Sequence, residues 1–431
     1  MKRTVAIFLM MVLTLSALFI CCGAGLSATK SNDVVTIEYW QYFFETKVNL
    51  MDKLIKDFEA KNPNIKVVQQ HFPYDSYEQK VAAAISAGTG PDIINIYYGW
   101  DPKYVQAKVL KPLPSKQFPV AQLEKDFAPM IKVNKFGGKY YTLPTAVRTL
   151  GLFWNKDIFK ANGLDPEKPP KDLDELLAMA QKCTKRNGDK LEIEGLTFQP
   201  TGQLHCWFRP VLLQQFGQPP LSKNNKKVLW NASENGYKAF QFLVDLAKKY
   251  KVGENNFFTD DATAFINGKA ALHIDGSYRL GAIASQAPNL NYGVAPLPSY
   301  HGVQTTFGSF WTNGITRNAS GKKLAAAAKF LQYLTSHEVM REWTRQIGEI
   351  GARTEFATDK DLLSNKKLAP FIQQLPTATS YFYIDEAADR KAVCDAIDQV
   401  LLNNVDPRKA LDEATLKVQK MLDNYWKKPQ E

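Results

Sequence analysis

The first part of the chain alternates between two spacings of hydrophobic residues. Apolar side chains alternate with polar ones in residues 34–40 and 65–68, and residues 91–96 form a short hydrophobic run, so each segment is predicted to be a strand. Residues 50–60 and 77–87 between them carry apolar positions three or four apart, which predicts helices. Strands that alternate with helices indicate an α/β fold with a mostly parallel sheet.

Two further hydrophobic runs, residues 140–143 and 150–154, flank Arg148. Both are rich in residues that favour strands, and polar residues 155–157 follow the second run. We therefore expect two strands with Arg148 between them, an arrangement suited to a hinge.

The rest of the chain is richer in helix. Helical spacing covers residues 172–186, 204–216, 234–250, 261–267, 324–334, 339–347, 393–403 and 407–426. Strands are predicted at residues 270–274 and 291–298. We expect the chain to cross between domains again at residues 291–298 and at residues 335–338. The paired carboxylates Asp260 and Asp261 are interpreted as a helix N-terminus rather than as a catalytic pair.

Residues 1–28 have the pattern of a secretory signal peptide. Lys2 and Arg3 precede a largely apolar run, and small residues close the segment at Ala28. An uncleaved membrane anchor is the alternative, because the apolar run is close to the length of a membrane span. Cys21 and Cys22 also resemble the acylated cysteine of a bacterial lipoprotein signal, although the residue before them is Ile20 rather than a small one.

Composition limits the class of protein further. Beyond the predicted signal the cysteines are Cys183, Cys206 and Cys394, too few for a disulfide scaffold, and whether Cys183 and Cys206 pair stays open. The length favours two lobes over one core. The formal charge of +11 allows an anionic partner, but no uninterrupted basic run of five or more occurs, so we interpret the excess as a solvated surface and expect no nucleic acid partner.

Several motifs carry a resemblance to a known family. They are FEAKNPNIKV at residues 58–67, GTGPDII at 88–94, YTLP at 141–144 with WNK at 154–156, FINGKAAL at 265–272 with DGSY at 275–278, residues 325–336, and ALDEA at 410–414. In this order and spacing they resemble the extracellular solute-binding proteins of ABC transporters, in the sugar-binding family that includes maltose-binding proteins. The similarity spans nearly all of the chain after the predicted signal.

The resemblance implies a two-lobed periplasmic-binding-protein fold of type II, with a hinge between discontinuous lobes. We assign residues 29–147 and 296–336 to the N-terminal lobe and residues 148–295 and 337–431 to the C-terminal lobe. The implied function is to bind a sugar, expected to be an oligosaccharide, between the lobes and to deliver it to the permease subunits of an importer. The protein is expected to be a non-catalytic monomer without a cofactor, either periplasmic or tethered to the outer face of the cytoplasmic membrane.

Sugar sites combine aromatic platforms with short polar or charged side chains, and the chain offers such residues at the expected strand ends. In the first lobe these candidates are Trp40, Tyr42, Glu45, Tyr98, Trp100 and Asp101. By resemblance, further ligand contacts are expected at Arg148, Trp207, Tyr278, Gly308, Trp311 and Arg353. Each aromatic has packing as its alternative role, and Arg148 has a hinge salt bridge.

Other kinds of function remain as alternatives. Two arginines, Arg148 and Arg353, would suit an anionic sugar or a sugar phosphate such as a glycerophosphate-type ligand. Metal binding through Tyr97 and Tyr98 is disfavoured, because alternation along a strand would send the two side chains to opposite faces. The sequence contains no GxSxG, HExxH or P-loop motif, so no catalytic or metal site is expected.

Overall fold

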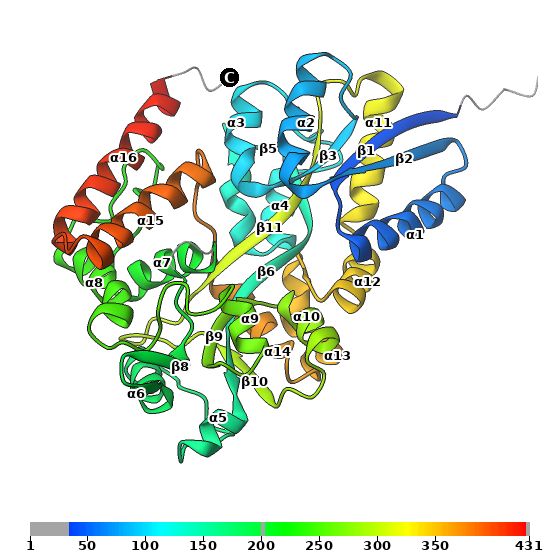
Figure 1. The fold of residues 1–431 in the computed structure, drawn as a ribbon. Coiled ribbons are helices and arrows are strands. Elements are labelled where there is room, and N and C mark those ends of the chain that lie inside the picture. Colours follow the sequence, from blue (N-terminus) through cyan, green and yellow to red (C-terminus); the bar gives the residue numbers. More distant parts are fainter. Residues whose placement is uncertain (1–33, 200–202, 428–431) are drawn as a thin grey trace, which may run out of the picture. The chain divides into compact units, whose positions relative to one another are not determined.

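The computed structural model describes residues 34–199 and 203–427, and Figure 1 shows their arrangement. The predicted signal peptide, its cleavage near Ala28 and lipidation at Cys21 or Cys22 all lie outside the described residues. Within those two described ranges, no helix has the length and apolar character that crossing a membrane requires.

Most strands of the described chain belong to one mixed sheet. Its order is β2-β1-β3-β11-β6-β9-β8-β7, with β10 and β12 also paired to β6 and β13 paired to β11. The strands are β1 (Val35–Tyr42), β2 (Ile65–Phe72), β3 (Ile93–Tyr97), β6 (Thr142–Asn155), β7 (Lys185–Asn187), β8 (Lys190–Leu196), β9 (Ala270–Gly276), β10 (Tyr292–Pro296), β11 (Thr306–Ile315), β12 (Ile350–Gly351) and β13 (Ala378–Thr379). A small hairpin of β4 (Lys135–Phe136) and β5 (Lys139–Tyr140) stands apart from this sheet.

Helices surround this sheet. They are α1 (Glu45–Lys61), α2 (Tyr74–Ser86), α3 (Asp101–Gln106), α4 (Val120–Asp126), α5 (Lys156–Ala161), α6 (Leu173–Cys183), α7 (Gln203–Gln215), α8 (Glu234–Lys248), α9 (Asp261–Ile266), α10 (Arg279–Gln286), α11 (Gly321–Leu334), α12 (His337–Ile347), α13 (Lys360–Leu363), α14 (Ala369–Gln373), α15 (Glu386–Leu402) and α16 (Pro407–Lys427). The predicted α/β class is confirmed. The N-terminus predicted at Asp260 is also confirmed, since its side chain caps α9 by accepting from the backbone N–H of Thr263 at 2.8 Å.

The expectation of a mostly parallel sheet holds only for part of the chain. β1 pairs in parallel with β2 and β3, as the strand–helix–strand pattern predicted. The long strands β6 and β11 instead run antiparallel to each other and lie side by side through the middle of the structure (Figure 1). The order along the chain could not predict this, because 159 to 172 positions separate the paired residues.

β6 is one continuous strand, which corrects the prediction of two strands flanking Arg148. Its first half pairs with β11 and β12, and its second half, from Leu150 onward, pairs with β9 and β10. Arg148 lies within the ladder opposite Ser309. The register shifts between Trp311 and Thr312, opposite Pro144, a residue that has no N–H to donate to a ladder. Arg148 therefore lies close to the point where β6 stops pairing with β11 and β12 and starts pairing with β9 and β10.

Helix α12 packs against the first helix of the described chain. Glu342 of α12 pairs with Lys53 of α1 at 2.9 Å, and Glu338 pairs with Lys61 at 3.7 Å. β12, which follows α12, pairs with the first half of β6. Further along the chain, α14 packs against β6 and β10. The crossing expected near residues 335–338 stays a prediction.

The C-terminal helices form a separate packing group. α15 and α16 lie side by side and pack against α8, and α15 also contacts α7 (Figure 1). Their buried faces carry apolar side chains three or four positions apart, including Val393, Ile397 and Val400 on α15. These contacts position α7, which carries one wall of the cavity described next.

Candidate binding site

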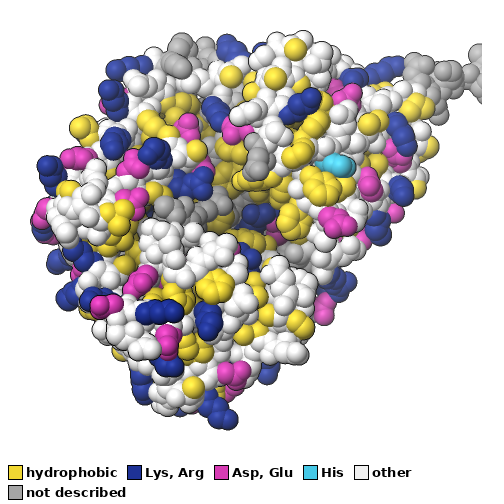
Figure 2. Space-filling view, viewed as in Figure 1, with side chains coloured by type: hydrophobic (Ala, Val, Ile, Leu, Met, Phe, Trp, Pro, Cys, Tyr) yellow, Lys and Arg dark blue, Asp and Glu magenta, His cyan; other side chains and the backbone are white. Residues whose placement is uncertain are grey.

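One cavity of about 400 Å³ collects residues from many separate elements of the described chain. Its lining residues are Tyr42, Phe44, Lys47, Tyr74, Tyr97, Arg148, Trp207, Tyr278, Arg279, Ala282, Trp311, Ile347 and Glu349. Figure 2 shows a hollow with hydrophobic side chains at its edge and lysine and arginine side chains close to it. A volume of this size and a lining of this kind are typical of small-molecule sites.

Chain direction explains why the first wall forms here. Tyr42 and Tyr97 are the last residues of β1 and β3, which are parallel. The carboxyl ends of parallel strands meet at one edge of a sheet, where helices also begin and leave room for a ligand. Phe44 and Lys47 at the start of α1 and Tyr74 at the start of α2 complete this wall.

Trp311 of β11 is the centre of an aromatic cluster at this wall. Its ring lies 4.1 Å from that of Tyr42 and 6.1 Å from those of Tyr74 and Tyr97. The planes are tilted or edge-on, as the quadrupoles of aromatic rings prefer. Trp207 of α7, which interacts with Tyr97, stacks on Phe307 with 5.6 Å between the ring centres and 11° between the planes. Each tryptophan is therefore held in place by neighbouring rings.

A buried ion triad forms the polar floor. Oε1 of Glu349 accepts from Lys47 Nζ at 2.8 Å and from Arg148 Nε at 2.6 Å, and Oε2 accepts from Trp343 Nε1 at 2.9 Å. Burial alone would raise the pKa of Glu349, but the charges of Arg148 and Lys47 outweigh this effect and hold the pKa at about 2. Glu349 is thus ionised at neutral pH, and the triad carries one net positive charge toward the cavity.

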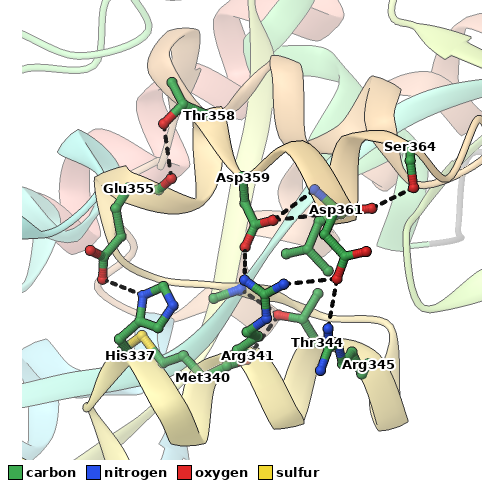
Figure 3. Close-up of polar contacts among 12 residues, drawn as sticks. His337, Met340, Arg341, Thr344, Arg345, Glu355, Thr358, Asp359, Asp361 and Ser364 are labelled. Atoms are coloured by element: carbon green, nitrogen blue, oxygen red, sulfur yellow. Dashed lines mark hydrogen bonds and ion pairs between the residues drawn. The ribbon is translucent and has the colours of Figure 1, made fainter.

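Helix α12 places Glu349 through contacts on both of its faces. Trp343 points inward to that carboxylate. On the outer face Arg341 bridges Asp359 and Asp361 at 2.5 and 2.7 Å, and Arg345 also reaches Asp361 at 2.6 Å (Figure 3). These outer ion pairs connect α12 to the following segment through α13, so the short turn that carries Glu349 is held between two fixed elements.

A second charged group lies around Asp275 of β9, the strand that pairs with the second half of β6. Arg279 at the start of α10 donates from Nε to Oδ2 of Asp275 at 2.5 Å, and His273 Nε2 lies 3.2 Å from the same oxygen. The guanidinium carbon of Arg148 lies 5.0 Å from the centre of the Tyr278 ring, and that of Arg279 lies 5.8 Å from it. Tyr278 therefore makes cation–π contacts with two arginines that also line the cavity.

Two buried polar groups of the lining interact with each other. They are the hydroxyl of Tyr97, which also interacts with Tyr98, and the indole N–H of Trp207. Buried polar atoms in native proteins are almost always paired with protein, water or ligand. The contact between Tyr97 and Trp207 thus joins the end of β3 to α7 at the cavity wall.

Five residues predicted for the site lie in this cavity. They are Tyr42, Arg148, Trp207, Tyr278 and Trp311. They come from β1, β6, α7, the turn before α10, and β11, so the fold unites positions up to 269 residues apart. Their contact with a ligand stays a prediction.

The other seven predicted residues do not line the cavity. Trp40 packs on Phe72 with its ring centre 4.8 Å away, since it lies two positions before the end of β1, where Tyr42 reaches the cavity. Glu45 is exposed on the first turn of α1, and Trp100 contacts Trp311 edge-on at 5.5 Å from behind. Tyr98 is buried against Phe310, with 4.7 Å between ring centres.

Asp101, Gly308 and Arg353 have structural roles instead. Asp101 is fully buried and accepts from the hydroxyl of Thr142. Gly308 faces Met130, whose Sδ would lie 2.7 Å from an added Cβ, so its small size serves packing. Arg353 pairs with Asp126 at 3.1 Å and donates to the carbonyl of Thr335 at 3.0 Å, so it is no partner of Arg148.

The tyrosine pair was also interpreted wrongly. β3 ends at Tyr97, and Tyr98 begins a turn of 3-10 helix, so strand alternation stops between them. Their rings lie 4.8 Å apart rather than on opposite faces. Within the described residues, no group of three or more His, Cys, Asp or Glu side chains is arranged to hold a metal ion.

Sequence reasoning missed most of the charged lining. Lys47, Arg279 and Glu349 were not predicted, nor were Phe44, Tyr74, Tyr97 and Ile347. Lys47 and Glu349 are 302 positions apart, so neither reveals its partner by spacing. A usable signal was present for Tyr74 and Arg279, because each stands at the start of a helix that follows a predicted strand.

Comparison with known proteins gives relatives along most of the chain. A maltotriose-binding protein of Pyrococcus abyssi is 24% identical over 92% of this chain and 81% of its own. A multiple sugar-binding protein of Streptococcus mutans is 26% identical over 86% and 87%. A periplasmic sn-glycerol-3-phosphate-binding protein of Yersinia pestis is 28% identical over 78% of each chain.

Solved structures share the fold. A solute-binding protein of an ABC transporter from Thermotoga lettingae, bound with α-D-tagatose, has a TM-score of 0.76 and 25% identity over 90% of this chain and all of its own. A cyclic α-maltosyl-1,6-maltose binding protein from Arthrobacter globiformis has a TM-score of 0.79 and 23% identity over 90% and 99%. The profile described as bacterial extracellular solute-binding protein matches residues 53–370, so the chain belongs to that family.

Proposed function

We propose that the protein is the solute receptor of an ABC importer and binds a sugar, expected to be an oligosaccharide, in the cavity around Trp207, Tyr278 and Trp311. One observation carries the proposal: the aromatic side chains of several separate elements line one cavity together with charged groups. Sugars match such a lining, because their C–H faces stack on rings and their hydroxyls pair with polar groups. The sugar-binding relatives support the same class of ligand.

Binding is proposed to close two lobes around the ligand. The first would hold residues 29–147 and 296–336, and the second residues 148–295 and 337–431, with Arg148 of β6 at the passage between them. Cavity residues come from both groups: Tyr42, Lys47 and Trp311 from one and Trp207, Tyr278 and Arg279 from the other. A ligand that touches both groups favours the closed state, because only that state offers all contacts at once.

The proposed cellular setting follows from the family. We propose export, with the protein free in the periplasm or tethered to the outer face of the cytoplasmic membrane, and delivery of the bound sugar to permease subunits. The protein would act as a monomer without catalysis, since its cavity holds aromatics and paired charges rather than a nucleophile with an adjacent base.

An anionic sugar or sugar phosphate is a second candidate ligand, favoured by the charge of the lining. The lining contains three cationic side chains, those of Lys47, Arg148 and Arg279. It contains one carboxylate, that of Glu349. Asp275 neutralises Arg279 from behind, so one positive charge remains for a ligand. The relative that binds sn-glycerol-3-phosphate gives this candidate further support.

Thermal-shift and calorimetric titration would test both candidates. Maltotriose and other neutral mono- and oligosaccharides, sugar acids, sn-glycerol-3-phosphate and divalent metals form the panel. A ligand that binds only the folded state raises the melting temperature. A shift with neutral oligosaccharides supports the first proposal, a shift with acids or phosphates alone supports the second, and no shift with any sugar would refute both.

A further inference from the structure

Two cysteines far apart in the sequence face each other between α7 and α15. Sγ of Cys206 lies 3.9 Å from Sγ of Cys394, although 188 positions separate them. Cys206 is buried and directly precedes Trp207 of the cavity wall, whereas Cys394 is only partly buried. A disulfide needs an Sγ–Sγ distance of about 2.05 Å, so the sulfurs have to approach by roughly 2 Å, which rotation about a side-chain torsion can supply.

A neighbouring ion pair keeps the two helices in this register. Arg209, three positions after Cys206, pairs with Asp389 of α15 at 3.1 Å, and both side chains are 5% exposed. The guanidinium of Arg209 also lies 3.9 Å above the ring of Trp230. These buried contacts hold the segments around both cysteines, so the closeness of the sulfurs does not depend on a mobile surface loop.

The two thiols differ in reactivity. The contact with Cys206 and the charge of Arg390 lower the pKa of Cys394, although burial opposes them. The same contact and burial raise the pKa of Cys206. The thiolate is the attacking form in thiol–disulfide exchange, and attack also requires access. Cys394 therefore meets both conditions for the first step, and Cys206 is placed for the second.

The chain belongs to an extracellular family, and disulfides persist outside the cytoplasm. We infer that Cys206 and Cys394 form a disulfide that joins α7 to α15 in the exported protein. The link would tie the helix that carries Trp207 to the C-terminal helices. It does not depend on which solute the cavity binds.

The reaction needs a disulfide-bearing oxidant, of which oxidised glutathione is the simplest. The Cys394 thiolate attacks one sulfur of the oxidant, forms a mixed disulfide and releases one thiolate. Cys206 gives up its proton, attacks Sγ of Cys394 and releases the second thiolate. The two protein thiols thus lose two electrons and two protons, and the oxidant becomes two thiols.

Cys183 provides an internal control. It is fully buried on α6, makes no sulfur–sulfur contact with another described residue, and burial raises the pKa of its thiol to about 11. It should remain a thiol under conditions that oxidise the pair. The pairing of Cys183 with Cys206, open from the sequence, is therefore not the one we infer.

Peptide mapping of the exported full chain tests the inference directly. The protein is treated with oxidised or reduced glutathione, denatured, alkylated without reduction and digested. We expect a linked pair of peptides containing Cys206 and Cys394, lighter than the separate peptides by the mass of two hydrogen atoms, while Cys183 is alkylated. Alkylation of both Cys206 and Cys394 after oxidation, or a link to Cys183, would overturn the inference.

Melting curves give a second readout. A link across so long a loop restricts the unfolded chain, so the oxidised wild type should melt about 5 °C or more above the reduced wild type. Cys183→Ser should keep this difference, whereas Cys206→Ser and Cys394→Ser should lose it. If Cys206→Ser does not fold, Cys394→Ser carries the comparison, and a redox-dependent shift that survives in Cys394→Ser would contradict the assignment.

Discussion

Arg148 and Glu349, which are 201 positions apart, meet through two nitrogens and one oxygen. Nε and Nη2 of the arginine lie 2.6 and 2.5 Å from Oε1 of the glutamate. The same oxygen accepts from Lys47, so a single buried carboxylate holds two cations that belong to α1 and β6. The hinge salt bridge considered for Arg148 is thus present, and the same side chain also lines the cavity.

Stability should depend on this carboxylate in acid. The folded pKa of Glu349 is about 2, against an ordinary value of 4.5, so its contribution is complete above pH 4.5 and is lost as the pH falls toward 2. The shift corresponds to roughly 3 kcal/mol of unfolding free energy. Glu349→Gln should remove this part of the pH dependence and lower stability at pH 7 by about 3–5 kcal/mol, because two buried cations lose their partner.

Urea unfolding between pH 2 and 7 measures this effect. The matched control is Glu355→Gln, which alters a carboxylate that is 50% exposed and paired with His337 (Figure 3). That control should stay within about 0.5 kcal/mol of the wild type at pH 7. Equal acid sensitivity of the wild type and Glu349→Gln would show that the carboxylate does not carry this effect.

Trp207 should contribute to ligand binding in two separable ways. Trp207→Ala removes an aromatic face and the indole N–H, and we expect affinity to fall at least about tenfold, or roughly 1.4 kcal/mol. Trp207→Phe keeps a smaller aromatic face without the N–H, so it should recover part of that loss.

Isothermal titration with the ligand found in the panel gives the dissociation constants. Trp426→Ala is the control, because Trp426 lies on α16, donates to the carbonyl of Asn225 and is absent from the cavity lining. Normal binding by Trp207→Ala, with an intact melting transition, would remove α7 from the proposed site.

Arg279 should separate neutral from anionic ligands. Arg279→Gln leaves the rings in place and removes one cation that faces the cavity. A sugar acid or phosphate should lose about tenfold or more in affinity, and its binding should weaken further with salt, since charge pairs near solvent are screened. A neutral sugar should change by less than about threefold.

Titrations at low and high salt would compare the two ligand types. Arg345→Gln serves as control, because Arg345 is 57% exposed and contacts Asp361 on the outer face of α12 (Figure 3). If acidic and neutral ligands lose equal affinity on Arg279→Gln, the side chain acts through packing rather than charge.

Asp101 should prove dispensable for binding although it resembles a site residue in the sequence. Burial raises its pKa well above the ordinary value, and the hydrogen bond from Thr142 only partly opposes this. A folded pKa above the unfolded one favours the folded state most at low pH, and this advantage is lost as the pH rises above about 4. Asp101→Asn should therefore be neutral or stabilising at pH 7, with affinity unchanged within about twofold.

Unfolding curves at pH 4 and pH 7, together with one titration of ligand, test this. The stability of Asp101→Asn relative to the wild type should improve from the lower to the higher pH. A large loss of affinity would show that Asp101 contacts the ligand. A large loss of stability at pH 7 would show that the carboxyl group of Asp101 is ionised in the folded protein.

Local patterns predicted the elements well but the partners poorly. Helical spacing identified most of α1, α7, α12 and α16, because one buried face per helix leaves a periodic trace in the sequence. Trp207 and Tyr278 were found through motifs that the family shares. Lys47 and Glu349 were missed because their role depends on the ion pair that they form with each other. The two residues are 302 positions apart, so no local spacing in the sequence reveals the pair.

Trp40 and Asp101 lie near the cavity in sequence but do not line it. Trp40 and Tyr42 share a face of β1, because side chains two positions apart on a strand point the same way, yet Trp40 packs on Phe72 and Tyr42 on Trp311. Asp101 is the first residue of α3 and is buried there. The residue type was therefore a good guide to the chemistry, and the depth of each side chain in the fold required the structure.

The continuity of β6 decides how this protein can be engineered. Residues 142–155 belong to the ladders of β11 and β12 and of β9 and β10, so splitting the chain near Arg148 would unpair strands on both sides of the cut. A reporter domain is better inserted at the turn of Gly137 and Gly138, where both residues have positive φ and nothing lies within 4 Å of an added Cβ. A fluorescent solute sensor built there would keep the strand that spans both ladders intact.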